Sequence, residues 1–391
     1  MIYLDHCATT PLRPEVWEAM VPYLRDRFGN PSSAHAWGRA AREAVEAARE
    51  KVAALIGAAP DEIVFTSGGT EADNLAIRGT VAARGSRGGH VVTTAIEHHA
   101  VLNTLRGLEK TGLAVTYLPV DARGSVSAAS VVAALRDDTV LVSVMHGNNE
   151  IGTVQPVAEI GAVLRGRGIL FHTDAVQTAG KVVVDVGALN VDLLSLSAHK
   201  INGPKGVGAL YIRRGVEISP LITGGHQEGG VRGGTENVAA IVGFGRACDL
   251  ARQELAQRSG ELRALRDHLL RRVREEYAGV SVNGDPVGGL PHVLSLSFGG
   301  LKAQEIVSAL DQEGIAVSAG SACTSGRTEI SHVLAALGIP SRDAMGTIRL
   351  SVGWGNTGEE MDKAARVLAG VIKKLEVLRD LEAAAGGRGC F

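Results

Sequence analysis

The stretch DLLSLSAHKINGPKGVGALY, residues 192–211, decides how the chain is expected to fold. An apolar run from Leu193 to Leu196 ends in small polar residues, and a glycine-rich turn then leads into a second apolar run. This pattern predicts a strand, a tight loop and a second strand. Lys200 lies in the loop, where its amine could form a Schiff base with a carbonyl cofactor. The alternative interpretation is a surface lysine beside a turn, because most lysines in proteins are exposed.

The two strands of this stretch are the last of seven that alternate with expected helices. The seven lie at residues 62–66, 90–95, 114–120, 139–146, 168–177, 192–197 and 206–212. Such alternation implies right-handed βαβ units, and therefore an α/β fold with a mainly parallel seven-stranded sheet.

The chain has 391 residues, which exceeds one typical domain. Further expected strands and helices are mixed in its last third, and a long helix is expected at about residues 238–276. We therefore expect a large domain at residues 15–259 and a smaller α/β domain formed by residues 1–14 and 260–391.

Polar clusters follow five of the seven expected strands. They lie at residues 67–70, 97–99, 148–150, 174–177 and 197–200. Ligand sites in parallel α/β sheets lie beyond the carboxyl ends of the strands. We therefore expect the five clusters to converge on one site.

Composition and charge argue against a nucleic-acid-binding, membrane or secreted protein. The net charge is −2, which provides no electrostatic basis for direct binding of nucleic acid or of an anionic membrane surface. No apolar run approaches the roughly 18 residues that span a bilayer, and the N-terminus lacks the pattern of a signal peptide. We therefore expect a cytoplasmic protein. The four cysteines contain no CxxC pair, so that type of redox pair or zinc knuckle is excluded.

Several residues could carry chemistry, each with a structural alternative. SGGTEADN, residues 67–74, combines glycines, hydroxyls and a helix start that favour a phosphate, although an ordinary helix N-cap would have the same residues. His98 or His99 could stack on a flat cofactor or shuttle a proton. A structural histidine is as compatible with this position, and metal binding is weaker because the spacing places no third ligand. We expect no metal site.

Three further positions complete the set. Asp174 follows an apolar strand and would need a partner such as a pyridinium nitrogen, unless it caps a helix. Cys323 lies in SAGSACTSG, a small and polar stretch that favours an exposed nucleophile, whereas Cys248 fits an inert buried thiol. Arg349 could present its guanidinium to a carboxylate, or lie on the surface of an edge strand. The loop TGGHQEGGVRGGTEN, residues 223–237, resembles a linker in composition, but its interleaved polar residues favour a ligand loop.

These motifs together resemble the cysteine desulfurases of the NifS and IscS type, in the fold-type I, class-V aminotransferase family of pyridoxal phosphate enzymes. The resemblance covers about nine tenths of the chain. It rests on LDHCATTP, FGNPSS, FTSGGTEADNLAI, IEHHAV, MHGNNEIG, HTDAVQ, SAHKINGPKGVGALY, GGHQEGGVRGGTEN, SAGSACTSG and IRLSVG.

The resemblance implies roles for individual residues. Lys200 would hold pyridoxal 5'-phosphate covalently, Asp174 would pair with its ring nitrogen, and His98 would stack over the ring. Gln177 would contact the ring oxygen, and Asn149 would lie near the ring and the substrate. The phosphate ligands would be Gly69, Thr70, Ser197 and His199, together with Thr235 of the other subunit of a homodimer.

The resemblance also implies a reaction. Arg349 would hold the carboxylate of L-cysteine, Lys200 would remove its Cα proton, and Cys323 would attack its sulfur. L-alanine and a persulfide on Cys323 would result, with His98 as a plausible proton shuttle. The persulfide would pass to an acceptor that stays open: an iron–sulfur scaffold, a tRNA-thiolating enzyme or a DNA-phosphorothioation system. Cys7 departs from the family pattern and could offer a second thiol.

Three alternatives remain at this stage. A selenocysteine lyase and a class-V transaminase would share the fold, but neither explains Cys323 as directly. A non-catalytic sulfur carrier is a third hypothesis, against which the presence of Lys200, Asp174 and His98 argues.

Overall fold

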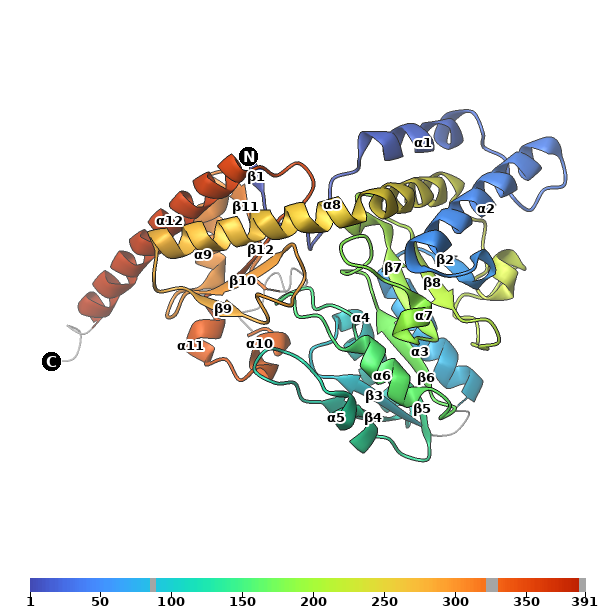
Figure 1. Ribbon diagram of the computed structural model, residues 1–391, viewed down its shortest axis with the longest axis horizontal. Coiled ribbons are helices and arrows are strands. Elements are labelled where there is room, and N and C mark those ends of the chain that lie inside the picture. Colours follow the sequence, from blue (N-terminus) through green and yellow to red (C-terminus); the bar gives the residue numbers. More distant parts are fainter. Residues whose placement is uncertain (85–88, 321–329, 387–391) are drawn as a thin grey trace.

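The computed structural model describes residues 1–84, 89–320 and 330–386. Cys323 and Cys390 lie outside these residues. The described part contains one large sheet and two small ones, with helices packed around them (Figure 1).

The large sheet has seven strands, of which six run in one direction. Their order is β2 (Ile63–Thr66), β8 (Gly208–Ile212), β7 (Leu193–Ser197), β6 (Leu170–Asp174), β5 (Thr139–Ser143), β3 (His90–Thr94) and β4 (Ala114–Leu118). Strand β8 runs in the opposite direction to the other six, because the tight loop after β7 reverses the chain. The predicted α/β fold with a mainly parallel seven-stranded sheet is confirmed.

Helices cover both faces of this sheet, and most of its strands are therefore buried along almost their whole length. Val91 and Leu193 point to one face, where they pack against helices α3 (Gly69–Arg84) and α4 (His99–Glu109). Their neighbours Val92 and Leu194 point to the opposite face. The elements on or beside that face are α2 (Ala36–Ile56), η1 (Pro60–Glu62), α5 (Ala128–Ala133), α6 (Val157–Leu164), α7 (Val186–Leu189) and the first half of α8 (Val238–Glu276).

The smaller part of the molecule is built on two short sheets. Strand β10 (Val293–Ser297) pairs antiparallel with β9 (Ser281–Asn283) and β12 (Thr347–Ser351). Strand β1 (Ile2–Tyr3) pairs with β11 (Ile315–Ala316). The remaining helices of this part are α9 (Ala303–Gln312), α10 (His332–Ala336), α11 (Ser341–Ala344) and α12 (Gly358–Gly386).

Helix α8 runs alongside both parts (Figure 1). Its residues between 239 and 251 pack in the core of the large sheet, and those between 262 and 273 pack in the core of the smaller part. Helix α1 (Pro14–Arg25) packs against α8. Residues 2 and 4, at the start of the chain, also pack in the smaller core. The first residues and helix α12 therefore belong to the same part of the molecule.

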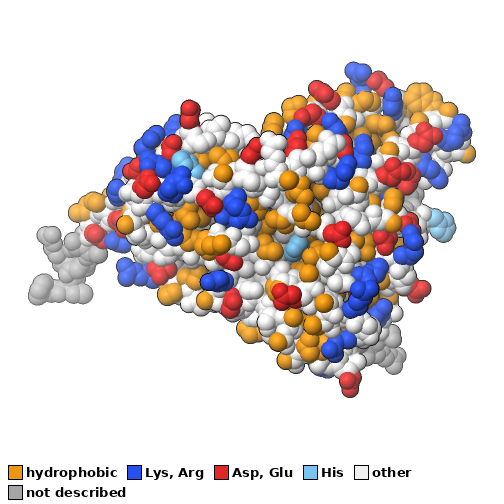
Figure 2. Space-filling view, in the orientation of Figure 1, with side chains coloured by type: hydrophobic (Ala, Val, Ile, Leu, Met, Phe, Trp, Pro, Cys, Tyr) orange, Lys and Arg blue, Asp and Glu red, His pale blue; other side chains and the backbone are white. Residues whose placement is uncertain are grey.

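Charge is mixed over the surface that Figure 2 shows, where basic and acidic side chains are interspersed. This agrees with the small net charge of −2. Among the described helices, none combines the length and the apolar composition needed to cross a membrane.

The loop at residues 223–237 is tied down by two ion pairs, so it is not a free linker. The Glu228 carboxylate, in η3 (Gln227–Gly230), accepts bonds of 2.7 and 2.8 Å from Arg49 and one of 2.8 Å from the Phe65 amide. Arg232 pairs with Glu71 at 2.9 Å. Glu228 adopts a left-handed φ of 47°, which a non-glycine residue rarely does. Its buried ion pair holds this conformation in place.

The substitution Glu228→Gln should therefore destabilise the fold by up to about 3 kcal/mol, because the buried Arg49 charge keeps only the exposed Glu46 carboxylate as its partner. Denaturant unfolding measures this change. The matched control is Asp61→Asn, which breaks an exposed ion pair with Arg214 and should leave stability unchanged. Equal effects of the two substitutions would contradict the account of the loop.

Candidate active site

A cavity of about 300 Å³ lies at the carboxyl edge of the large sheet. All five polar clusters that follow the strands contribute to its wall, as expected from the parallel direction of β2, β3, β5, β6 and β7. The predicted site residues that line it are Gly69, Thr70, His98, Asn149, Asp174, Gln177, Ser197, His199, Lys200 and Arg349.

Lys200 ends the short helix η2 (Ala198–Lys200), which follows β7 directly. Its Nζ donates hydrogen bonds to the carbonyl oxygens of Cys7 at 2.5 Å and of Ala8 at 2.8 Å. Burial lowers the pKa of Lys200, because a low-dielectric environment disfavours the ammonium form. The structure thus places an amine with increased nucleophilic character inside the cavity, rather than on the surface beside a turn.

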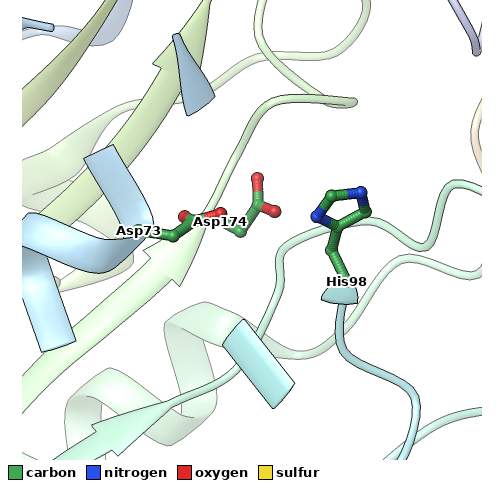
Figure 3. Close-up of side chains that lie close together, drawn as sticks. All are labelled: Asp73, His98 and Asp174. Carbon is green, nitrogen blue, oxygen red and sulfur yellow. The ribbon is translucent and has the colours of Figure 1, made fainter. Parts of the chain in front are cut away.

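Asp174, Asp73 and His98 form a cluster in the cavity wall. One donor atom from each lies within 4.8 Å of the others, and Figure 3 shows Asp174 between the side chains of Asp73 and His98. The residues come from the end of β6, from α3 and from the N-cap of α4. Two carboxyls and an imidazole could also hold a divalent cation, which the sequence did not lead us to expect.

Burial controls the protonation of this cluster. It raises the pKa of Asp174 to about 6 and, together with the Asp174 charge, raises the pKa of Asp73 well above its usual range. Burial and the Lys200 charge lower the pKa of His98 to about 4. At neutral pH, His98 is therefore a neutral imidazole, whereas the raised pKa of Asp73 favours its protonated form. Asp174 is the carboxylate that can bind a cationic partner.

Gln177 lines the cavity, and the oxygen of its side-chain amide has no hydrogen-bond partner among the described residues. Its Nε2 donates to the Cys7 carbonyl at 3.0 Å, whereas this oxygen, Oε1, is buried. His199 lies within 3.1 Å of the Thr9 hydroxyl through Nδ1, and burial lowers its pKa to about 4. Gly69 packs so closely on Val176 that an added Cβ would lie 2.8 Å from it.

Arg349, in β12, reaches the cavity from the smaller part of the molecule. Its guanidinium donates to Asp5 at 2.8 Å and to the Asn149 carbonyl at 2.9 Å, and its Nε has no described partner. The side chain is only 2% exposed, so the edge-strand surface interpretation was wrong. Main-chain hydrogen bonds in both directions join Arg349 to Ser318.

Thr235 lies outside the cavity. It is exposed and lines a separate hollow of about 240 Å³ together with Ser67, Arg232 and Asn237. Its predicted contact with the other subunit stays a prediction. Cys7 lines the cavity but is 1% exposed and packs with Leu290 and Val293. Cys248 is also buried and free, as predicted.

Several residues of the site were not singled out from the sequence. Asp73 could have been found, because it follows Thr70 by three residues and therefore lies on the same helix face. His332 has no such local signal, because it comes from α10; its ring lies 4.8 Å from that of His99. Glu150 accepts a hydrogen bond of 2.6 Å from Ser331, which also joins two distant segments.

The family profile described as Aminotransferase class-V matches residues 2–364. The chain belongs to this family.

Named relatives are similar along almost the whole chain. The cysteine desulfurase IscS of Dictyoglomus turgidum is 50% identical over 377 residues, which cover 96% of each chain. A solved NifS-like protein has a TM-score of 0.90 and 40% identity, covering 96% of this chain and all of the other. SspA in complex with cysteine has a TM-score of 0.80 and 40% identity, covering 90% and 99%.

Replacing the buried Asp174 should change how the stability of the cofactor-free protein depends on pH. Its carboxyl has a pKa of about 6 in the fold against 3.8 ordinarily, so the folded state loses stability as pH rises from about 4 to 6. Asp174→Asn should therefore make the cofactor-free protein more stable at pH 7, by up to about 3 kcal/mol, and this gain should vanish below pH 4. Thermal unfolding against pH measures it. Asp137→Asn, at an exposed site, is the control; a loss of stability in Asp174→Asn at pH 7 would contradict the assignment.

Proposed function

We propose that the protein is a cysteine desulfurase, a sulfurtransferase that uses pyridoxal 5'-phosphate to convert L-cysteine into L-alanine and a persulfide on Cys323. The observation that carries the proposal is the cavity in which the amine of Lys200, the carboxylate of Asp174 and the neutral ring of His98 come together. Near full-length similarity to proteins named cysteine desulfurase supports it.

The residues of the cavity fit this cofactor. Asp174 is a buried carboxylate in need of a cationic partner, and Gln177 Oε1 is a buried acceptor in need of a donor. The hydroxyls of Thr70 and Ser197 and the start of α3 provide donors for a phosphate. Pyridoxal phosphate, when bound, supplies the electron sink that makes the Cα proton of an amino acid removable.

The side chains then divide the work. Asp174 would keep the proton on the ring nitrogen of the bound cofactor, and His98 would cover the face of its ring. Lys200 would anchor the cofactor, and once the substrate amine has replaced it there, the freed Lys200 amine would take the Cα proton. Arg349 binds the substrate carboxylate with the guanidinium that Asp5 already orients.

The proposed nucleophile, Cys323, belongs to a segment whose described neighbours both contact the cavity wall. Ser318, on one side, pairs through its main chain with Arg349, and Ser331, on the other side, donates to Glu150. Attack by the Cys323 thiolate forms the S–S bond and breaks the substrate C–S bond. The electron pair of that bond stays with the three-carbon fragment, which takes up protons and leaves as alanine.

The proposal extends to the oligomeric state of the enzyme, its compartment and its sulfur acceptor. The enzyme acts as a homodimer in which Thr235 of each subunit completes the phosphate site of the other. It works in the cytoplasm and passes its persulfide to an acceptor protein for iron–sulfur cluster assembly or another sulfur transfer.

The substrate test separates this function from its alternatives. Incubation with L-cysteine and a thiol reductant should yield alanine and sulfide in equal amounts. Transfer of the amino group to a keto acid without sulfide would support a class-V transaminase instead. Turnover of selenocysteine but not of cysteine would support a selenocysteine lyase.

The substitution Cys323→Ser should abolish persulfide formation, with a loss of at least about 10³-fold in alanine production, because a serine hydroxyl does not replace the thiolate as the nucleophile that accepts sulfur. Cofactor absorbance should remain as in the parent protein. Cys248→Ser, which changes a buried thiol that does not line the cavity, should keep full activity. Desulfuration by Cys323→Ser at the parental rate would refute the assigned role.

A further inference from the structure

A second buried lysine, Lys181, lies directly behind the turn that carries Lys200. Its Nζ donates a hydrogen bond of 2.8 Å to the main-chain carbonyl oxygen of Lys200. Among the described residues, no main-chain amide donates to that carbonyl. The turn at residues 178–181 also approaches the Lys200 turn closely, since a Cβ on Gly180 would lie 2.9 Å from Ile201.

Other segments hold the neighbouring residues of the same turn. Thr10 donates to the carbonyl of His199 at 2.8 Å, and Arg258 donates to the Asn202 side chain at 2.5 Å. Asn202 itself has a left-handed φ of 64°. Residues on both sides of Lys200 are therefore held from outside the turn, and Lys181 supplies the contact to the main-chain carbonyl of Lys200 itself.

Lys181 carries a cost that packing alone does not explain. Its side chain is 6% exposed, and no described carboxylate pairs with it. Burial lowers its pKa to about 7. The titratable or charged groups that face it are Cys7, Lys200, Arg258, His6, His199 and His292. An apolar residue at this position would avoid the free-energy cost of burying an ammonium group beside other lysine, arginine and histidine side chains.

We propose that Lys181 is a positioning residue for Lys200, whose turn it fixes so that the Lys200 amine enters the cavity in the geometry needed for bonding to the cofactor. The proposal rests on the proposed function, because it concerns the attachment of pyridoxal phosphate. Lys181 acts through the main chain of Lys200 and touches neither cofactor nor substrate.

The test compares Lys181→Met with the parent protein. Pyridoxal phosphate is added to each cofactor-free protein, and absorbance measures the rate at which it attaches to Lys200. Attachment should slow on the order of 10- to 100-fold, because a displaced amine attacks less often in the productive orientation. Lys181→Arg, which keeps a donor, should recover part of the rate. Lys205→Met, at an exposed site in the same glycine-rich loop, should behave as the parent.

Thermal unfolding distinguishes positioning from a purely structural role. The pKa of Lys181 is about 7 in the fold against 10.5 ordinarily, so its penalty is complete below pH 7 and disappears as pH rises toward 10.5. Lys181→Met should therefore match or exceed the parent Tm at pH 7, and this advantage should shrink toward pH 10.

Attachment by Lys181→Met at the parental rate would overturn the proposal. So would slow attachment together with a Tm at pH 7 well below that of the parent, since the fold would then have failed. A parent protein that attaches no pyridoxal phosphate at Lys200 would overturn the proposed function, and the role of Lys181 with it.

Discussion

The common direction of six strands is the constraint on which the site depends. Because β2, β3, β5, β6 and β7 all end at one edge of the sheet, the residues that follow them share one cavity. The strands are buried on both faces, so only the residues at and just beyond their carboxyl ends face the cavity. The reversed strand β8 is the product of the tight loop that presents Lys200.

Burial then converts ordinary side chains into reactive ones. It lowers the pKa of Lys200 and of His98, and it raises the pKa of Asp174, so the amine and the imidazole tend toward their neutral forms. None of these groups would have this character at the protein surface. The cavity thus combines a nucleophilic amine, a neutral ring and a carboxylate that needs a cation, which is the combination that a pyridine aldehyde cofactor uses.

The sequence predicted the large sheet and the convergence of five clusters, because both follow from local patterns: apolar runs, glycine turns and polar strand ends. It did not predict contacts between distant segments. The Arg349–Asp5 pair joins residues 344 positions apart, and His332 meets His99 from the far end of the chain. Strand β9, with three residues, is too short for a periodic signal. The position of Cys323 relative to the cavity lies outside the described residues.

The central claim is that Lys200, and no other lysine, carries the cofactor. Borohydride reduction of the pyridoxal phosphate-loaded protein, followed by trypsin and mass spectrometry, tests it most directly. The account predicts that modification blocks cleavage at Lys200 and yields the peptide 182–205 with one added pyridoxyl phosphate group. The same group found on Lys181, or on no residue of the cavity, would contradict it.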